Sequence, residues 1–415
     1  MFRIWIYLKL NFLFSGLFLN KTANIVKFIK KKISNQSKKK YLVFSSQCRV
    51  GFLFILKFLK NKSKKREIIF CAYNLPEMIN IAVKLNYKVI FCDLNYQTGA
   101  MEIKDLRKKI SKKTSAIVLT NMFNNPKNSR EIKMLANKNK ITLIEDNAIY
   151  FDNFTKNNGK KIYSGYFGDF SIYSFNIMKN ISSLYGGAVS TNNKDFIEFY
   201  EKEYEKLNKF SVIPLIKQIL IYLILKLMAQ NFLYKFIFIR IIRFAHFKNI
   251  KSILKIFYPS LKSVKKNLPK YYFTKMSNLA IILTYLQLKD EESRKKIFNL
   301  RKQKQIFYFD NITKIPKANY SLIKKNDKNF QNYLDFPILV KNKELLNKYL
   351  LNNGIEVRYK HYYNCEKLFK KNTKCINAEK YENELICLPI HSKISFVYMN
   401  FVINNLKNFF NKSNL

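Results

Sequence analysis

Short runs rich in β-branched and aromatic residues alternate with helix-length segments along the first half of this 415-residue chain. Strands that are separated by helices favour a mainly parallel sheet with helices on both faces. We therefore predict an α/β fold whose large domain holds a mainly parallel mixed sheet. The predicted strands are residues 41–44, 67–71, 88–92, 115–119, 142–144, 169–173 and 188–191.

Two residues beyond the carboxyl ends of these strands stand out, because ligands of such sheets bind in the loops that follow the strands. Asp146 follows an apolar strand, and Lys179 stands in a polar turn about thirty residues later. In pyridoxal chemistry a lysine amine condenses with the cofactor aldehyde, and a carboxylate keeps the ring nitrogen protonated. Asp146 and Lys179 suit these roles, and the hydroxyl of Ser174 suits the cofactor phosphate.

Each of these residues also has a structural explanation. An aspartate after a strand is most often a turn residue or a helix cap, and a lysine in a Lys-rich chain is most often a surface charge. The joint spacing of the residues favours the chemical interpretation. The pair Gly186 and Gly187, shortly after Lys179, permits a tight turn and a close approach of the backbone.

Several further segments, spread from residue 41 to the C-terminus, carry a family resemblance. They are 44–49 (FSSQCR), 71–76 (CAYNLP), 89–93 (VIFCD), 121–126 (NMFNNP), 144–148 (IEDNA), 174–180 (SFNIMKN), 336–338 (FPI), 361–362 (HY) and 388–391 (LPIH). On these segments the sequence resembles the DegT/DnrJ/StrS family of sugar aminotransferases. The resemblance implies a pyridoxal-phosphate-dependent transferase of fold type I, with a smaller C-terminal α+β domain.

The resemblance also implies roles for individual residues. Lys179 becomes the residue that forms the Schiff base with pyridoxal 5'-phosphate and shuttles protons, Asp146 the partner of the ring nitrogen, and Ser174 a phosphate ligand. The amides of Cys48 and Arg49 become phosphate donors at a helix N-terminus. Tyr73 is either the ring that stacks on the cofactor or a core residue.

The reaction that the resemblance implies is transfer of an amino group, from glutamate, to a nucleotide-linked keto-sugar. Such a homodimeric enzyme would serve surface polysaccharide or lipopolysaccharide synthesis. Dehydratases of the family have His in place of the lysine, so Lys179 favours transamination. The chain departs from the family at four residues: Ile149, Leu184, Tyr185 and Phe273. An inactive sugar-nucleotide binder or membrane-surface assembly protein is therefore the alternative.

We predict three parts of the chain: an amphipathic arm over residues 1–40, a large domain over 41–288, and a small domain over 289–415, each domain with its own core. The arm packs on the body or lies on a membrane. In the small domain, Asn353 and Gly354 predict the end of a helix before a strand at 355–359. An apolar helical insert at 205–265 contains residues 214–247, whose apolar runs are shorter than the roughly 20 residues of a membrane span. Core packing and contact with a membrane surface both remain open for it. On a membrane, its basic residues would meet anionic headgroups; they are Lys217, Lys226, Lys235, Arg240 and Arg243.

The charge of the chain is strongly positive, with 76 Lys and Arg against 27 Asp and Glu. The lysines are spread along the whole chain without a compact basic motif, so we predict no nucleic-acid partner. The six cysteines form no CxxC pair and have no His cluster beside them, which predicts reduced thiols and no metal site. We expect a cytoplasmic protein, peripheral to the inner face of the membrane if the insert binds there.

Overall fold

The protein is described from a computed structural model. The described residues are 3, 5–122, 126–149, 151–157, 159–257, 264, 267–269, 273–316, 320–323, 334–360, 362–371 and 374–412. Residues 123–125 and 361, which belong to two of the family-like segments, lie outside this set.

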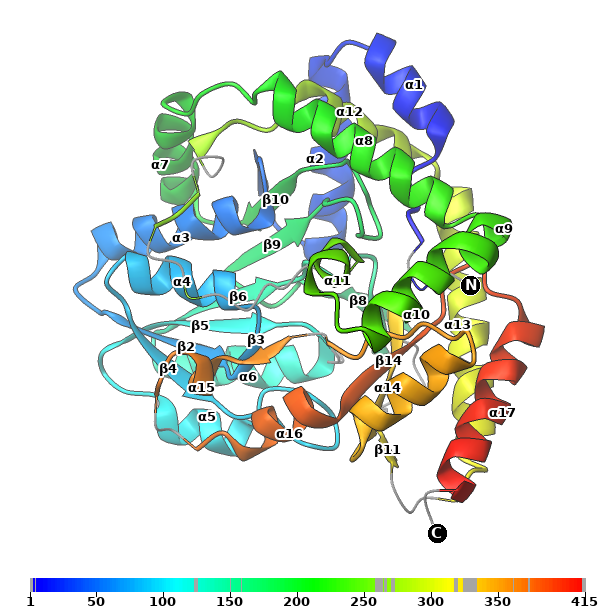
Figure 1. Ribbon diagram of the computed structural model, residues 1–415. Helices are drawn as coiled ribbons and strands as arrows, with labels where there is room; N and C mark the ends of the chain where they lie inside the picture. The colour runs from blue at the N-terminus through cyan, green and yellow to red at the C-terminus, as the bar shows by residue number, and fades with distance from the viewer. Residues whose placement is uncertain are drawn as a thin grey trace.

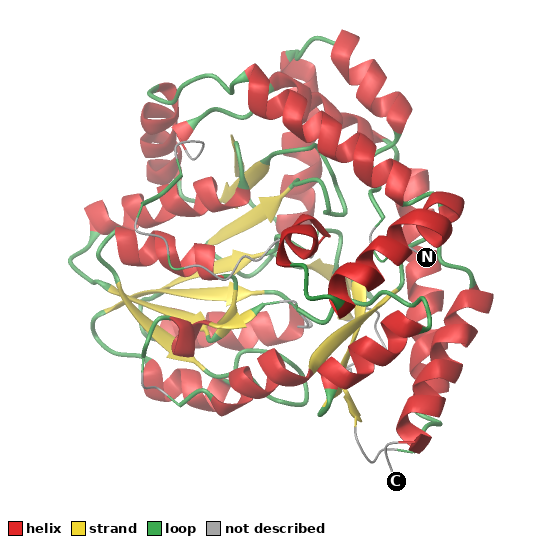
Figure 2. Ribbon diagram, viewed as in Figure 1, coloured by secondary structure: helices red, strands yellow, loops and turns green. Residues whose placement is uncertain are grey.

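A seven-stranded sheet forms the centre of the molecule, with the strand order β1-β10-β9-β6-β5-β2-β4 (Figure 2). Strand β10 runs antiparallel to the other six strands, which all point in the same direction. All seven predicted strands are confirmed to within two residues at each end, because their apolar runs are buried in the sheet. The strands are β1 Tyr41–Ser45, β2 Glu67–Cys71, β4 Lys88–Cys92, β5 Thr114–Thr120, β6 Thr142–Asp146, β9 Phe170–Ser174 and β10 Gly187–Thr191.

Helices cover both faces of this sheet (Figure 1). Neighbouring side chains of β1 point to opposite faces of the sheet, because successive side chains of a strand alternate in direction. Val43 joins the core beneath α3, whereas Leu42 packs in a second cluster with α2 and α12. The other helices of this part lie along the remaining strands. The helices are α2 Ala23–Ser37, α3 Cys48–Lys62, α4 Pro76–Lys84, α5 Ile103–Lys109, α6 Pro126–Lys138, α7 Lys194–Glu205 and α12 Asn278–Lys289.

A second sheet of three antiparallel strands lies in the C-terminal part, with the order β11-β12-β14. One continuous core joins the two sheets, since Ile338 of β12 and Ile144 of β6 belong to the same buried cluster. The expectation of two separate cores is therefore wrong, and the predicted domain boundaries stay a prediction. The elements are β11 Tyr320–Leu322, β12 Asp335–Val340, β14 Leu385–Pro389, α13 Glu291–Ile312, α14 Lys343–Asn352, α15 Cys365–Leu368, α16 Ile376–Glu384 and α17 Phe396–Lys412.

Residues 355–359, which the sequence suggests as a strand, form no strand in the structure. Gly354, with φ of 75°, ends α14 as expected. Beyond it only Arg358 pairs with the sheet, through an isolated bridge to Cys387. The carboxylate of Glu356 accepts hydrogen bonds from Arg3 and Tyr234, which lie outside this sheet.

Two short antiparallel strand pairs complete the fold. They are β3 Tyr73–Asn74 with β13 Tyr363–Asn364, and β7 Phe154–Asn157 with β8 Lys160–Tyr163.

The N-terminal arm packs on the body, as one of the two expectations had it. Its helix α1 (Leu10–Phe18) lies on α12, and a Cβ on Gly16 would come within 3.0 Å of Leu279 and Leu283. Leu13 of α1 also shares a buried cluster with Tyr222 of the insert.

The insert is helical, as predicted. Among the described residues no single helix is long and apolar enough to cross a membrane. The segments Val212–Met228 and Asn231–Phe247 reach that length and apolar content only when taken together, and the pair is bent by 76° between them. Its elements are α8 Val212–Met228, α9 Asn231–Leu233, the π-helix η1 Tyr234–Phe238, α10 Ile239–Phe247 and α11 Lys251–Phe257.

Candidate active site

Asp146 is the last residue of β6 and lies at the carboxyl edge of the sheet. Its side chain is buried, and one carboxylate oxygen accepts a hydrogen bond from the amide of Ala148 at 3.0 Å. Because strand side chains alternate, the preceding Glu145 points to the other side, where it accepts from the amide of Gly168 at 2.6 Å. Burial raises the pKa of Asp146, while the Ala148 amide and Lys179 act in the opposite direction.

Lys179 lies in a turn that follows β9, five residues beyond Ser174. Hydrogen bonds hold this turn. The Lys179 amide donates to the carbonyl of Asn176 at 3.0 Å, and the hydroxyl of Ser182 donates to the carbonyl of Ile177 at 2.9 Å. Gln287 of α12 in turn accepts from the Ser182 amide at 2.9 Å. The turn is thus fixed to the helix that covers it.

The amine of Lys179 sits among charged groups of the same site. The pKa of this amine is lowered from 10.5 to about 8, mainly by burial and also by Arg358 and Arg49, while Asp146 and Cys48 act in the opposite direction. A lysine that shuttles protons must be partly neutral near pH 7, and the direction of this shift meets that requirement. A lowered pKa alone does not select Lys179, because burial also lowers the pKa values of Lys226 and Lys304 to about 8. Among these three lysines, only Lys179 has its pKa raised by Asp146.

The N-terminus of α3 lies beside this pair. Gln47 is its N-cap residue, and Cys48 and Arg49 are the first two residues of the helix, where backbone N–H groups can bind an anion. Asp146 and burial raise the pKa of the Cys48 thiol, which places Cys48 near the carboxylate. The hydroxyl of Ser46 and the side-chain oxygen of Gln47 are buried and have no hydrogen-bond partner among the described residues.

Gly187 allows the turn before α3 to approach the central sheet. It pairs with Ser45 on one side and with Ser174 on the other, so it joins the two strand ends that border the site. A Cβ on Gly187 would lie 2.4 Å from the amide nitrogen of Cys48. No residue other than glycine fits there without moving the backbone of α3, which agrees with the close approach predicted from the sequence.

Two side chains from the C-terminal part complete the cluster. Sequence reasoning did not select Arg358, and it placed Tyr362 in a family-like segment without giving it a role. Arg358 affects the pKa of Lys179, and the half-buried Tyr362 has its pKa raised by burial and by Asp146. The Tyr362 amide donates to the Tyr73 hydroxyl at 3.1 Å. Tyr73 itself is buried, with its ring against Tyr362 and Tyr381. This packing supports the core alternative for Tyr73, and its role as a stacking ring stays a prediction.

Two of the four departures from the family pattern contact the insert. Leu184 has φ of 67° and is fully buried in the cluster that the arm and α8 share. The Tyr185 hydroxyl accepts a hydrogen bond from Gln218 of α8 at 2.8 Å. Ile149 packs partly buried against the main core, and Phe273 is 39% exposed. Leu184 and Tyr185 therefore stabilise the insert on the turn that carries Lys179.

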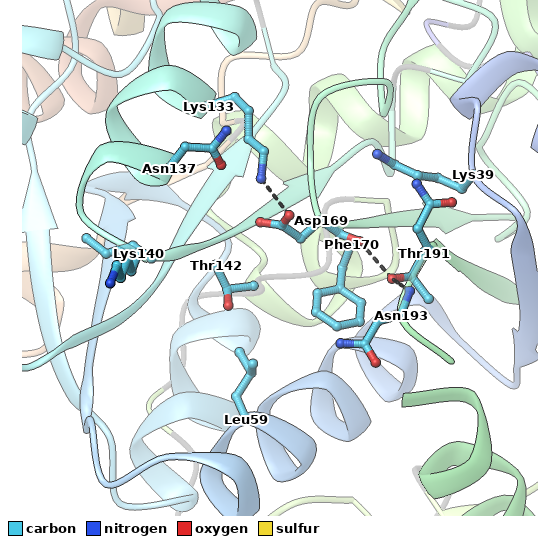
Figure 3. Close-up of a pocket in the computed structure, with 12 residues that line it drawn as sticks. Lys39, Leu59, Lys133, Asn137, Lys140, Thr142, Asp169, Phe170, Thr191 and Asn193 are labelled. Carbon is cyan, nitrogen blue, oxygen red and sulfur yellow. Dashed lines mark hydrogen bonds and ion pairs between the residues drawn. The ribbon is translucent and has the colours of Figure 1, made fainter. Parts of the chain in front are cut away.

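A separate cavity of about 550 Å³ opens at the opposite edge of the sheet (Figure 3). Its lining includes Thr142 and Phe170, the first residues of β6 and β9, whereas Asp146 and Ser174 end the same strands. Lys133 and Asp169 form an ion pair of 2.5 Å across it. The cavity therefore does not belong to the site around Lys179.

Comparison with known proteins finds a matching family model for the N-terminal half of the chain. A model of the DegT/DnrJ/EryC1/StrS aminotransferase family matches residues 11–207. GDP-perosamine synthase of Escherichia coli O157:H7 is 38% identical over 105 residues, which are 25% of this chain and 28% of that protein. The chain thus aligns with less than a third of the length of this relative.

Solved structures extend the likeness to the whole chain. Helicobacter pylori PseC, an aminotransferase involved in the biosynthesis of pseudoaminic acid, is 17% identical, with a TM-score of 0.70 over 97% of this chain and 96% of that one. The Escherichia coli GDP-4-keto-6-deoxy-D-mannose-3-dehydratase with bound hydrated PLP is 18% identical, with a TM-score of 0.70 over 97% of both chains. Residues 11–207 of this protein are thus similar to the DegT/DnrJ/EryC1/StrS aminotransferase family, and the chain adopts the fold of the solved sugar aminotransferases.

Proposed function

We propose that this protein is a pyridoxal-phosphate-dependent aminotransferase that acts on a nucleotide-linked keto-sugar. The observation that carries the proposal is that the buried Asp146 ends β6 beside β9, and that the turn after β9 carries Lys179, whose pKa is lowered to about 8. Relatives that are named for GDP-sugar and UDP-sugar chemistry support the substrate class.

The residues of the site fit pyridoxal phosphate. Asp146 supplies a buried carboxylate for the ring nitrogen, and the first turn of α3 supplies backbone N–H groups for the phosphate. The buried hydroxyl of Ser46, which lacks a partner among the described residues, and the hydroxyl of Ser174 are further polar groups at that end. When bound, the cofactor supplies an aldehyde that captures amines and a ring that accepts electrons.

The protein's own residues would transfer the proton, keep the ring nitrogen protonated and favour an anionic substrate. Lys179 in its neutral form accepts a proton at Nζ and returns it, since its lowered pKa keeps an appreciable neutral fraction near pH 7 to 8. Asp146 holds a proton on the ring nitrogen, because its negative charge is stabilised by the Ala148 amide. Arg358 and Arg49 place positive charge near Lys179, which favours its neutral form and suits an anionic substrate.

Finer parts of the proposal follow from the family resemblance. They are glutamate as the amino donor, a role in surface polysaccharide or lipopolysaccharide synthesis, a homodimer, and a cytoplasmic location at the inner face of a membrane. A dehydratase shares the fold, so the fold alone does not select the reaction. The lysine at position 179 favours amino transfer, as the sequence resemblance implies.

The test is covalent capture of the cofactor. Purified protein incubated with pyridoxal phosphate should absorb in the visible range and lose this band on treatment with borohydride, and peptide mapping should find the reduced adduct on Lys179. The matched controls are Lys226 and Lys304, whose pKa values are equally lowered to about 8 but which have no charged contact with Asp146.

Lys179→Ala should abolish the adduct while the far-UV circular dichroism stays unchanged, because no other of these amines lies beside Asp146. Lys226→Met should leave the adduct intact. An adduct that persists in Lys179→Ala, or that maps to Lys226 or Lys304, would remove the central assignment. A normal adduct without amino transfer from glutamate to any nucleotide keto-sugar would instead support the inactive binder.

A further inference from the structure

The arm and the insert present apolar side chains to the outside of the molecule. On α1 these side chains recur at helical spacing, so they line one face, opposite to the face that packs on α12. Phe14 is 59% exposed and Phe18 is 85% exposed. The exposed apolar residues of α1 and its C-cap are Leu10, Phe14, Leu17, Phe18 and Leu19.

The insert continues this surface. Helix α8 lies beside α1, because Phe12 and Leu13 pack in one cluster with Leu215 and Ile219 (Figure 1). Its inner side is buried at Tyr222, while its outer side is apolar and about half exposed. The exposed apolar residues of the insert are Val212, Ile213, Ile216, Leu220, Leu223, Ile224, Leu227, Phe232, Phe236, Ile237, Ile241, Phe244 and Phe247. We call these residues, together with those of α1, the apolar face.

The segments that carry the apolar face contain no acidic residue. From residue 1 to 66 and again from 206 to 289 there is neither Asp nor Glu, although the whole chain has 27 of them. Lys217, Lys235 and Arg240 are exposed beside the apolar residues of the insert. A large exposed apolar patch marks an interaction surface, and uncompensated positive charge around it selects a negatively charged partner.

A second copy of this chain fits the surface poorly. Two identical apolar faces would bring together basic residues from segments that have no carboxylate to pair with them, and like charges at an interface are repulsive. An anionic bilayer meets both requirements, because its interior accepts the apolar side chains and its headgroups neutralise the lysines and arginines. We propose that the apolar face of α1 and α8–α10 docks the protein on the surface of an anionic phospholipid membrane.

The contacts of these helices set the manner of docking. Tyr222 of α8 and Ile242 of α10 are buried against other parts of the protein, and the Tyr222 hydroxyl donates to the carbonyl of Leu8 at 3.0 Å. The helices are therefore held on the body and lie along the membrane surface. Lys226, which the sequence suggested as a headgroup contact, donates instead to the carbonyl of Ile6 at 2.9 Å and lies over the ring of Trp5. That expectation for Lys226 is wrong.

Flotation of the full-length protein with vesicles tests the proposal. The protein should float with vesicles of phosphatidylcholine and phosphatidylglycerol at low salt, and the bound fraction should fall as salt rises. It should not float with pure phosphatidylcholine to the same extent. The variant Leu220→Ser/Ile224→Ser/Leu227→Ser should lower partitioning by at least about tenfold, because three half-exposed apolar side chains no longer enter the interface.

The matched control replaces three equally exposed apolar residues elsewhere, in the variant Met134→Ser/Leu345→Ser/Ile376→Ser. This control should float like the parent. The variant Lys217→Gln/Lys235→Gln/Arg240→Gln should lose roughly a hundredfold in partitioning to anionic vesicles, at about 1 kcal/mol for each basic residue. Circular dichroism and thermal unfolding should be the same for all variants.

Three outcomes would overturn the proposal. They are no flotation with anionic vesicles, equal loss in the control variant, and a change of sedimentation mass in the α8 variant without any loss of flotation. The last outcome would assign the apolar face to self-association. Because the face is separate from Lys179, capture of pyridoxal phosphate is an independent readout, and failure of one proposal leaves the other standing.

Discussion

Lys179 shows how a single residue acquires a pKa that differs from its ordinary value. Burial and two guanidinium groups lower the pKa of the amine to about 8, and the charge of Asp146 opposes them. The lysine is therefore half neutral at about pH 8, whereas an exposed lysine would be almost fully charged. The fraction of neutral Lys179 therefore depends on how far Asp146 offsets the effects of burial and of the two arginines on its pKa.

This balance predicts a pH profile for cofactor capture. The neutral amine is the nucleophile, so the rate of adduct formation should rise with pH and level off above pH 8 to 9. Asp146→Asn removes the charge that raises the Lys179 pKa, so the midpoint of the profile should move to lower pH. Stopped-flow absorbance between pH 6 and 10 measures both profiles.

Glu145→Gln is the control for this prediction, since Glu145 adjoins Asp146 in sequence but faces the other side of the sheet. Its profile should coincide with that of the parent. A midpoint that moves upward in Asp146→Asn would contradict the assigned charge contact. With glutamate as donor, Asp146→Asn should also slow amino transfer by several orders of magnitude, because the ring nitrogen loses its anionic partner.

At the scale of elements, the site depends on the contact between β10 and the N-terminus of α3. Gly187 pairs with both neighbouring strands and lies against the backbone of Cys48. The departures Leu184 and Tyr185 belong to the same connection and tie it to α8. The insert is therefore part of the support of the active-site turn as well as an outer surface.

Gly187→Ala should displace the first turn of α3, because the added Cβ would meet backbone atoms of Cys48 that cannot rotate away. We expect a loss of about 3 kcal/mol in the free energy of unfolding. The affinity for pyridoxal phosphate should fall in parallel, since the phosphate donors move. Urea unfolding and titration with the cofactor measure the two effects.

The comparison variant is Gly354→Ala, where the Cβ meets nothing within 4 Å but φ is 75°. It should cost about 1 kcal/mol through backbone strain and leave cofactor affinity unchanged. Equal cofactor affinity in Gly187→Ala and the parent would show that the first turn of α3 does not bind the phosphate.

At the scale of the whole molecule, Glu356 connects three distant parts of the chain. Its carboxylate accepts from Arg3 of the arm at 2.9 Å and from Tyr234 of the insert at 2.9 Å, and it is 1% exposed. The arm, the insert and the C-terminal part thus meet at one buried group. This junction lies two residues before Arg358, so it also fixes the segment that reaches the active site.

Removing this group should destabilise the molecule strongly. Glu356→Ala leaves Arg3 without its carboxylate in a largely buried position, and we expect a loss of about 3–5 kcal/mol in the free energy of unfolding. The control is Asp195→Asn, which breaks an exposed ion pair with Lys62 and should change stability little. Guanidinium unfolding compares the two variants. Equal stability of both would show that the junction does not hold the three parts together.

The sequence by itself determined the strands, and it singled out the two central residues of the candidate site. Apolar runs of strand length are recognisable locally, so β6 and β9 were predicted within two residues, and Asp146 and Lys179 follow from them. The six cysteines, predicted to be reduced, are all free and buried. Only the tertiary structure brought Arg358 and Tyr362 to the site, because they stand about 180 residues beyond Lys179. No local pattern marks Arg358, and the family-like segment 361–362 gives Tyr362 no place beside Lys179.

Contacts between residues far apart in the sequence also explain why the expectations for residues 355–359 and for Lys226 were wrong. Residues 355–359 have a strand-like pattern, but the partner of Glu356 in the folded chain is Arg3, more than 350 residues away, which no local pattern indicates. Lys226 looks like a surface lysine in the insert, yet the arm folds over it and supplies its acceptor. Side-chain periodicity determines local structure, whereas the side on which a helix meets the rest of the chain depends on long-range packing, which only the folded molecule reveals.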